Sequence, residues 1–483
     1  MKKNKNIPVI LVCVIFAVVF LAILLIFMQK DSAEEEALLS DIKVEQIPIE
    51  EIEEMSADEP TETPEKEEEP KPTEIPEPAE TPEPTETPKP TETSEPAETP
   101  KPTETPEPVK EPEQEKLPKV EVQEAAQPIT VLIEEVESAR ISSKEIQIIF
   151  TDNYDDTVET YLLMRRNVLT GGGWENVGSL PSDKNATGDQ NIFSDKLGES
   201  SPQQYEYRVD VKLPEGQTNT AQEGKAILAS NVMICIDPGH FAGRNQVTGE
   251  QTYGYAEGDF TIEVAKELKR ILKETYGIDS YMTRSGGSIT LGGYTDGNLD
   301  SGHISLRGTY TAEKDADLFM SIHTNANEEN ANGYPTCMQP ISINKPLVIA
   351  NGLACSSDTM MRVANGIGVN LAATNYQLGI STVKDFATVE KNAVSEWTKA
   401  ANDKTDAAGT VFRRTGSSGG EYYGVLKGAA KVNKPGIIVE HGFHTVPEMR
   451  KEAMEGNLKT LWAQADAYGI AYGFGFVSNI HRP

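Results

Sequence analysis

The distribution of hydrophobic and polar residues divides this chain of 483 residues into four parts. Residues 1–30 contain one long apolar run, whereas the few apolar residues of 31–123 follow neither a helical nor a strand period. Residues 124–229 alternate apolar and polar positions in short runs, as half-buried β-strands do. Residues 230–483 combine short, solidly apolar runs with stretches of helical period, which is typical of an α/β domain. We therefore predict two folded domains behind an apolar N-terminus and a long polar segment.

Three short apolar runs in the C-terminal part predict strands that are buried on both faces of a sheet. They are Val232–Ile236, Leu318–Ile322 and Gly436–Val439. A helix with an apolar stripe is predicted at Phe260–Leu272, between the first two runs. The stripe consists of Ile262, Ala265, Leu268 and Leu272. Strands that alternate with helices predict a twisted, mostly parallel sheet flanked by helices.

Residues 124–229 carry the alternating pattern of an all-β domain. The clearest strands are Ile146–Phe150, Thr160–Met164, Trp174–Val177 and Tyr205–Val211. Gly, Asn, Asp and Ser cluster between these strands, which predicts a two-sheet β-sandwich. The Tyr205-x-Tyr207-x-Val209 pattern and the strand that begins at Trp174 resemble strands of a fibronectin type III domain. No set of residues suited to catalysis occurs here, so we interpret the domain as a spacer or docking module.

The N-terminal apolar run predicts a membrane anchor. Three lysines, Lys2, Lys3 and Lys5, precede Ile7–Met28, which is long enough to cross a hydrocarbon core of roughly 30 Å as a helix. The basic flank is expected to stay in the cytoplasm, so that everything after the helix lies outside the membrane. The residues that follow Met28 do not resemble a signal-peptide cleavage site. We therefore favour a retained, single transmembrane helix within residues 1–30 over a removed signal peptide.

Residues 31–123 predict a disordered acidic spacer. The segment is rich in Pro, Glu and Thr and nearly lacks aromatic residues, so it buries too little apolar surface to offset its conformational entropy. A degenerate repeat, P-x-P-T-E-T, begins at Pro82, Pro88 and Pro100. Frequent proline favours an extended chain of about 3.1 Å per residue. We interpret the segment as a stalk that carries the folded domains off the membrane; a merely solubilising linker is the alternative.

Charge and cysteine content exclude some classes of partner and site. The formal net charge of −32 and a pI near 4.6 argue against a nucleic-acid partner, which requires concentrated Lys and Arg. The four cysteines are widely spaced and form no C-x-x-C pair, so neither a cysteine zinc site nor a disulfide framework is indicated. Cys235 lies inside an apolar run and is interpreted as a small buried hydrophobic residue.

Four residues suited to metal chemistry accompany the predicted elements of the α/β domain. His240, His323 and Glu440 follow the three apolar runs, and Glu257 stands just before the first turn of the predicted helix. Because ligands bind beyond the carboxyl ends of parallel strands, these side chains are expected to converge at one edge. Two imidazoles and one carboxylate make a zinc site with an open position, and a further carboxylate beside it suits metal-assisted amide hydrolysis. The spacing matches no compact zinc motif, and a single His at a strand end is more often structural, so the pattern alone leaves the metal site open.

The residues around these four resemble the zinc-dependent N-acetylmuramoyl-L-alanine amidases, which have an α/β fold. The matching segments occur in the family's order from Asn231 to the C-terminus: Ile236–His240, Glu257, Thr283-Arg284, Leu306-Arg307, Ala316–Asn325, Val425–Lys427 and Val439–Phe443. The resemblance implies that His240, Glu257 and His323 bind zinc. It also implies that Glu440 is the catalytic carboxylate, acting first as general base toward water and then as general acid toward the departing amine. The implied substrate is peptidoglycan, cut between the lactyl group of N-acetylmuramic acid and L-alanine of the stem peptide.

Two segments depart from the family pattern near the expected site. Ser285–Ile304 is a Gly-rich insertion, and we interpret its His303 as a loop residue and not as a ligand. His441 and His444 stand where the family usually has other residues. We expect them to tune the pKa of Glu440, to contact substrate, or to be ordinary polar residues of the rim.

A third segment, Ser381–Arg414, is polar and carries no catalytic motif. We predict helical stretches within it, at Phe386–Ala401. It is interpreted as a surface helix that lines the substrate groove, or as a cover of the active site that a protein partner removes, as in some relatives.

Together these features predict a zinc-dependent peptidoglycan hydrolase, anchored in the cell membrane with its catalytic domain facing the wall. Two alternatives stay open: a zinc hydrolase of another amide or peptide, and a catalytically silent wall-binding module. The complete set of four candidate residues speaks against the silent module, because inactive relatives of enzymes commonly lose one. The sequence does not identify the preferred wall chemotype, a regulatory protein partner or the oligomeric state.

Overall fold

The computed structural model describes residues 131, 133–152, 158–182, 190–219, 224–245, 253–327, 337–396 and 410–483. All of them belong to one of the two units of the chain, Gln114–Pro483. The predicted anchor in residues 1–30 and the predicted spacer at 31–123 lie outside the described residues and stay predictions. Within the described residues, no helix combines the length and the apolar character needed to cross a membrane.

The first folded part consists of two antiparallel sheets. One sheet has the order β1-β2-β5, and the other has the order β4-β3-β6-β7. Their bounds are β1 Ile133–Ser142, β2 Glu145–Asp152, β3 Thr160–Asn167, β4 Glu175–Pro181, β5 Asn191–Lys196, β6 Gln204–Lys212 and β7 Ile227–Ser230. Alternate residues such as Ile146, Ile148 and Leu163 are buried in one hydrophobic cluster that includes residues of both sheets. The four strands predicted here are present as β2, β3, β4 and β6, whereas the fibronectin type III assignment stays a prediction.

The second folded part contains a seven-stranded sheet of mixed direction, with the order β14-β15-β13-β16-β12-β8-β9. The bounds are β8 Met233–Pro238, β9 Asp279–Met282, β12 Leu318–Asn325, β13 Leu347–Ala350, β14 Ser395–Glu396, β15 Val411–Arg413 and β16 Gly436–Phe443. β13 and β16 pair antiparallel, and all the other neighbours pair parallel. The predicted α/β domain with a mostly parallel sheet is therefore confirmed, with the three predicted strands present as β8, β12 and β16. The sheet reverses direction once, between β16 and β13, which the apolar pattern did not reveal.

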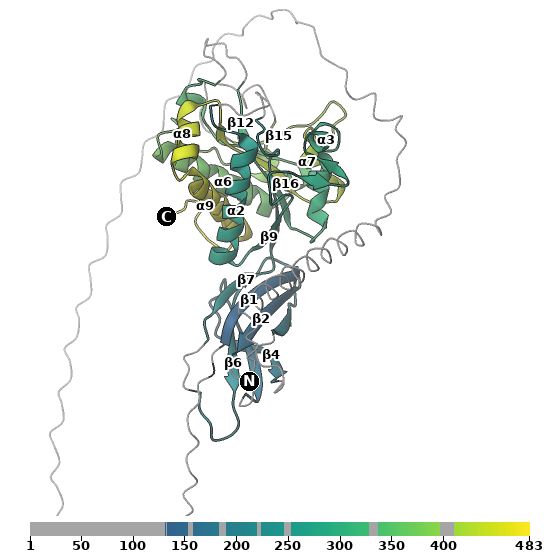
Figure 1. The fold of residues 1–483 in the computed structure, drawn as a ribbon, viewed down its shortest axis with the longest axis vertical. Helices are drawn as coiled ribbons and strands as arrows, with labels where there is room; N and C mark the ends of the chain where they lie inside the picture. Colours follow the sequence, from purple (N-terminus) through teal and green to yellow (C-terminus); the bar gives the residue numbers. More distant parts are fainter. Residues whose placement is uncertain are drawn as a thin grey trace, which may run out of the picture. The chain divides into compact units, whose positions relative to one another are not determined.

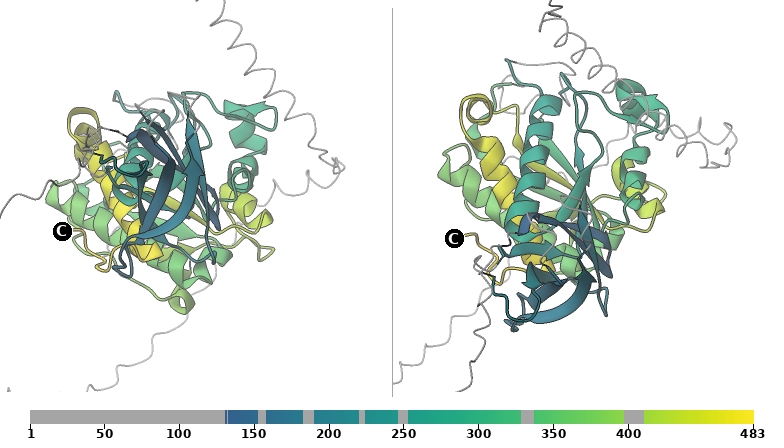
Figure 2. Two further views of the ribbon diagram at one scale, coloured as in Figure 1. Left: turned by 90° about the horizontal axis from the view of Figure 1, so that it is seen from below. Right: turned by 60° about the horizontal axis from the view of Figure 1, so that its bottom comes forward.

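Helices cover both faces of this sheet (Figures 1 and 2). α2 Glu257–Tyr276, α6 Asp358–Gln377 and α9 Leu458–Phe474 cover one face, and α3 Asp296–Gly302, α4 Ser305–Thr309 and α7 Gly424–Lys431 lie on the other side. The shorter α5 Gly352–Cys355 and α8 Pro447–Glu455 are the remaining α-helices among the described residues of this domain. All four residues of the predicted apolar stripe are buried in α2, which ends at Gly277 with a φ of 65°.

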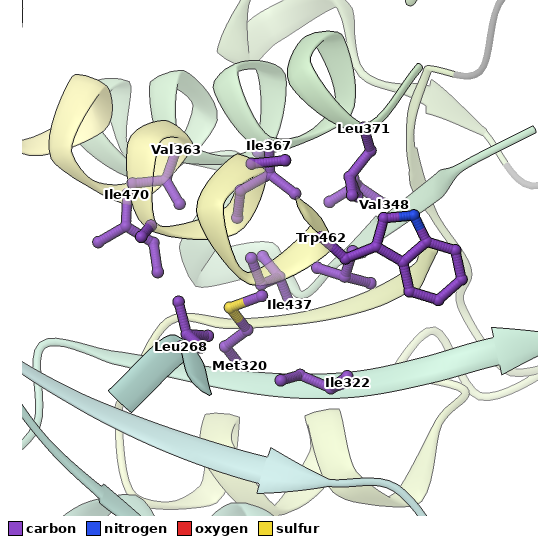
Figure 3. Close-up of a cluster of buried hydrophobic side chains, with 14 of the residues drawn as sticks. Leu268, Met320, Ile322, Val348, Val363, Ile367, Leu371, Ile437, Trp462 and Ile470 are labelled. Carbon is purple, nitrogen blue, oxygen red and sulfur yellow. The ribbon is translucent and has the colours of Figure 1, made fainter. Parts of the chain in front are cut away.

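The larger hydrophobic core lies between the sheet and the α2, α6 and α9 layer. Figure 3 shows side chains of α6 and α9 directed at Met320 and Ile322 of β12 and at Ile437 of β16. Trp462 of α9 is fully buried there. A Cβ on Gly469 of α9 would lie 2.3 Å from the backbone nitrogen of Ile367, so glycine is required where α9 crosses α6. This core fixes the strands whose ends carry the candidate residues.

The prediction of helix at Phe386–Ala401 is wrong for the part that the structure describes. Ala387 pairs with Thr410 in an isolated parallel bridge, Lys391–Ala393 form one short 3₁₀ turn, and β14 then joins the edge of the sheet. The amide side chain of Asn365 in α6 donates to the carbonyl oxygen of Val389 and accepts from its N–H. These tertiary bonds use the backbone groups that a helix needs for its own bonds. Residues 397–409 lie outside the described residues.

Candidate metal centre

The sheet brings the candidate residues together from four separate elements. His240 follows the end of β8, His323 lies in β12, and Glu440 lies in β16 directly opposite His323 in the register of the two strands. Glu257 is the first residue of α2, not a residue before the first turn as we predicted. One ligand atom from each of His240, Glu257 and His323 lies within 4.8 Å of the others. The predicted convergence is thus present in the structure.

The contacts among these groups define a compact polar centre. His323 Nδ1 lies 2.9 Å from Glu257 Oε1, and His240 Nε2 lies 3.4 Å from Glu257 Oε2. The two imidazole rings meet edge to face, with their centroids 5.0 Å apart. Glu257 is fully buried, and its Oε1 also accepts a hydrogen bond of 3.0 Å from the N–H of Thr324. The carboxylate is therefore held between the two imidazoles.

Two buried polar atoms of the centre have no hydrogen-bond partner among the described residues: His240 Nε2 and Glu440 Oε2. A buried polar atom without a partner costs about 1–3 kcal/mol, so such atoms need an explanation. A cation would give both of them a favourable neighbour. Two imidazoles and one carboxylate are also a donor set that zinc accepts with a fourth position open. The residues present fit a bound zinc ion.

Burial and the neighbouring charges shift the ionisation of these groups. Burial alone would raise the pKa of Glu257, but the two imidazoles beside it outweigh burial and hold this pKa well below its usual range. Burial alone would lower the pKa of His240, but Glu257 and Asp300 outweigh it and raise this pKa to about 10. Burial raises the pKa of Glu440 to about 7, with His323 acting in the opposite direction. A carboxyl group that titrates near neutral pH is suited to both accepting and donating a proton.

Two buried arginines hold the segment that presents His240. Arg307 donates from Nη1 to Asp237 Oδ1 at 3.0 Å and from Nη2 to the carbonyl oxygen of His240 at 2.8 Å. Arg284 donates to the carbonyl oxygens of Pro238 at 3.1 Å and Gly239 at 3.0 Å. The Thr-Arg and Leu-Arg motifs of the sequence thus position a candidate ligand and do not face the groove.

The insertion Ser285–Ile304 contributes a residue that the sequence did not reveal. It contains the hairpin β10 Thr290–Leu291 and β11 Tyr294–Thr295, followed by α3. Asp300 of α3 lies with Oδ2 3.7 Å from His240 Nδ1, and its Oδ1 accepts a bond of 2.9 Å from Arg307. Its carboxylate faces the ring nitrogen on the side of His240 away from Glu257. His303 stacks on Tyr294, with ring centroids 3.4 Å apart, and the metal cluster consists of other residues.

His441 and His444 are buried and do not line the groove, so the interpretations as rim residues and as substrate-contacting residues are wrong. The remaining interpretation holds for His441, whose charge acts to lower the pKa of Glu440 against the effect of burial. His441 Nε2 lies 2.8 Å from Asp466 Oδ2, and its Nδ1 lies 3.1 Å from the carbonyl oxygen of His323. His444 Nδ1 lies 3.0 Å from Thr324 Oγ1. His441 and Asp466 are both fully buried. His441 and His444 each contact a residue of β12, the strand that carries His323, and help to fix this strand in place.

The family model of the N-acetylmuramoyl-L-alanine amidases matches residues 234–472. The comparison with curated protein sequences gave no match. Among solved structures, the amidase AmiC2 of Nostoc punctiforme is 20% identical and has a TM-score of 0.32; the match covers 50% of this chain and 96% of that one. The CwlD amidase of Clostridioides difficile, solved in complex with the GerS lipoprotein, is 16% identical with a TM-score of 0.33; the match covers 51% of this chain and 100% of that one. Ami1 of Mycobacterium smegmatis is 17% identical with a TM-score of 0.31, over 51% of this chain and 98% of that one.

At these identities and scores the assignment depends on the family match and not on the three structures. The matched range begins at the second residue of β8 and ends inside α9, so it contains the sheet except Met233, and all the candidate residues. Residues 234–472 therefore form a domain of the N-acetylmuramoyl-L-alanine amidase family, and the chain is an enzyme of that activity.

Proposed function

We propose that this chain is a zinc-dependent peptidoglycan hydrolase that cleaves the amide between N-acetylmuramic acid and L-alanine of the stem peptide. In this proposal His240, Glu257 and His323 hold the zinc ion, and Glu440 is the catalytic carboxylate. The observation that carries it is the cluster of three ligand-type side chains within 4.8 Å, with Glu440 beside it in the same groove. The family match supports peptidoglycan as the substrate.

The roles of the four residues in this proposal are argued from their positions. The three side chains would hold the zinc ion, which when bound would supply Lewis acidity toward water and the substrate carbonyl. Glu440 stands opposite His323 on the neighbouring strand, so its carboxyl group is fixed beside the cluster. With a pKa near 7 it accepts the proton of the attacking water and then delivers it to the L-alanine nitrogen as the amide bond breaks. Thr324 and Asn245 fix Glu257 through its carboxylate and its backbone N–H.

Digestion of purified cell wall tests the reaction. We expect the protein to release stem peptides with a free L-alanine amino group and to leave the lactyl carboxylate on the glycan, as mass spectrometry detects. Extensive chelation should abolish the release, and added zinc should restore it. Intact disaccharide-peptides alone would refute the amidase assignment and favour another amide substrate or a silent binding module. Full activity of a metal-free sample would refute the metal role.

We also propose that residues 1–30 anchor the enzyme in the cell membrane and that residues 31–123 space it from the membrane, with the catalytic domain on the wall side. The apolar run Ile7–Met28 behind three lysines, and the Pro-, Glu- and Thr-rich composition of the segment after it, support this. In intact cells with a permeabilised wall, an external protease should remove the catalytic domain from the membrane fraction. Protection from the protease until the membrane is dissolved would refute this orientation.

A further inference from the structure

The groove that contains the metal cluster extends well beyond it along the sheet. Its volume is about 660 Å³. Next to Glu440, the groove has an apolar surface formed by Ile349, Ile438 and Val425. Beyond this surface lie Arg414, Tyr422 and Tyr423. β15 runs antiparallel to β16, so Arg414, which follows β15, lies toward the amino end of β16 and away from Glu440.

Arg414 is the only lysine or arginine among the described residues that line this groove. Two carboxylates, Glu257 and Glu440, lie at the other end. The groove therefore has an acidic end that carries the metal cluster, an apolar middle, and a basic end.

Two adjacent arginines at this place have different roles. Arg413 donates from Nη2 to Glu421 Oε1 at 2.9 Å, and the same oxygen accepts from the N–H of Gly352, so Arg413 fastens a loop. Arg414 instead lies with its guanidinium carbon 3.5 Å from the centroid of the Tyr422 ring. The N–H of Tyr422 donates to the carbonyl oxygen of Arg414 at 3.1 Å, which joins the two ends of the loop and fixes the stacked pair.

A guanidinium carries five N–H donors in a planar fork, and the fork matches the two oxygens of a carboxylate. Tyr423 contributes a hydroxyl group beside Arg414. Tyr422 is 47% exposed, Arg414 is half-buried, and both line the groove, so a ligand in the groove can reach the stacked pair. The arrangement is preorganised for an anionic group that arrives from the apolar middle.

We infer that Arg414, held by Tyr422 and Tyr423, binds a carboxylate of the stem peptide. This inference rests on the proposed function. The muramoyl side of the scissile bond has no free carboxylate, since its acid is the one joined in the amide, whereas the peptide side carries carboxylates on later residues. The peptide therefore runs from Glu440 along the apolar surface toward Arg414, and the glycan leaves the cluster in the other direction.

Steady-state kinetics with three synthetic muramoyl-peptides test this inference and identify the carboxylate. The first substrate has free carboxylates on its second residue and at its C-terminus, the second has a carboxamide on the second residue, and the third has a C-terminal carboxamide. For the wild-type enzyme, we expect KM to rise for one of the two amides on the order of tenfold to a hundredfold, as for the loss of a charge-assisted pair of bonds. Arg414→Gln should raise KM for the free-carboxylate substrate by a similar factor and change kcat by no more than about threefold. The KM values of this variant should be the same for the free-carboxylate substrate and for both carboxamide substrates. Arg414→Lys should recover part of the loss, because it keeps the charge without the fork.

Arg362→Gln is the matched control, because Arg362 also stacks on a tyrosine, with its guanidinium carbon 4.7 Å from the Tyr472 ring, but lies outside the groove. Thermal unfolding of each variant shows that it is folded. Equal losses on all three substrates in Arg414→Gln, or a wild-type enzyme that does not distinguish them, would overturn the inference while leaving the amidase function intact. Failure of the folded wild-type enzyme to cleave any of the three would overturn the proposed function and the inference with it.

Discussion

Gly239 lies so close to the ring of His323 that no larger residue fits at this position. A Cβ built on Gly239 would lie 2.4 Å from Cε1, 2.6 Å from Nδ1 and 2.7 Å from Nε2 of His323. Non-bonded carbon atoms make optimal contact at about 3.5–4.0 Å. A Gly239→Ala substitution therefore forces the imidazole of His323 to retreat by about 1 Å or more, or displaces the end of β8 by as much.

The displacement is large on the scale of metal coordination. Metal–ligand distances vary by only about 0.2 Å, so a displaced His323 cannot remain at bonding distance while His240 and Glu257 keep their places. Loss of groups that merely orient a ligand already lowers metal affinity by about 10- to 100-fold. We expect Gly239→Ala to lower zinc affinity at least a hundredfold, on the order of 3 kcal/mol. The fold should survive, because overpacking one buried site costs about 1–3 kcal/mol of unfolding free energy.

Competition with a chromophoric chelator measures the zinc affinity, and thermal unfolding measures the stability of the same preparations. Gly286→Ala is the control, since a Cβ at Gly286 meets nothing within 4 Å. It should bind zinc as the wild type does. A folded Gly239→Ala protein whose zinc affinity stays within about twofold of the wild type would refute the assignment of His323 as a ligand.

Four other changes test the site and its supports. Glu440→Gln should keep zinc affinity within a few-fold in the chelator competition but reduce turnover by roughly two to four orders of magnitude; a near-normal rate would place the proton transfer elsewhere. Asp300→Ala should weaken zinc binding by about 10- to 100-fold if its carboxylate orients His240. Burial would lower the pKa of His441, but Asp466 outweighs burial and raises this pKa above its usual value. The His441–Asp466 pair therefore stabilises the fold fully below about pH 6.5, the pKa of an unfolded histidine. This stabilisation is lost as the pH rises through the pKa of His441 in the folded protein. In denaturant titrations, Asp466→Asn should therefore lose most stability relative to wild type at acidic pH, and a pH-independent difference would contradict the charged pair. Trp462→Ala should cost about 3–5 kcal/mol of unfolding free energy without changing the zinc affinity of the folded protein.

The sequence predicted the strands of the α/β domain because short, solidly apolar runs have few other uses than burial on both faces of a sheet. The convergence of His240, His323 and Glu440 followed, since the ends of neighbouring parallel strands meet at one edge. The direction of β13 was not predictable, because apolar spacing is the same in parallel and antiparallel strands. The segment after Phe386 was misread as helix because the hydrogen bonds that hold it extended come from Asn365, a residue distant in the sequence.

The candidate site was predicted less completely than the strands that carry it. The sequence left three interpretations of His441 open, because its buried partner, Asp466, stands 25 positions further along the chain. Asp300 was missed because it lies in a Gly-rich insertion with no apolar period, and only the folded hairpin and α3 bring it to His240. Both residues depend on tertiary contacts with polar partners, for which a single sequence has no periodic signal.

The buried charges around the metal centre are better explained by positioning than by stability. Arg307 is 1% exposed and is bound to Asp237 and Asp300, and a buried ion pair of this kind roughly offsets its own desolvation. His240, however, has a φ of 55°, a left-handed conformation that costs a residue other than glycine about 1–3 kcal/mol unless its surroundings impose it. The bond from Arg307 to the carbonyl oxygen of His240, and those from Arg284 to the two residues before it, act directly on this strained segment. The two arginines thus hold His240 in a conformation that its own backbone disfavours but that directs its ring toward Glu257. Replacing them with apolar residues of similar size is consequently expected to weaken the metal centre more than the fold.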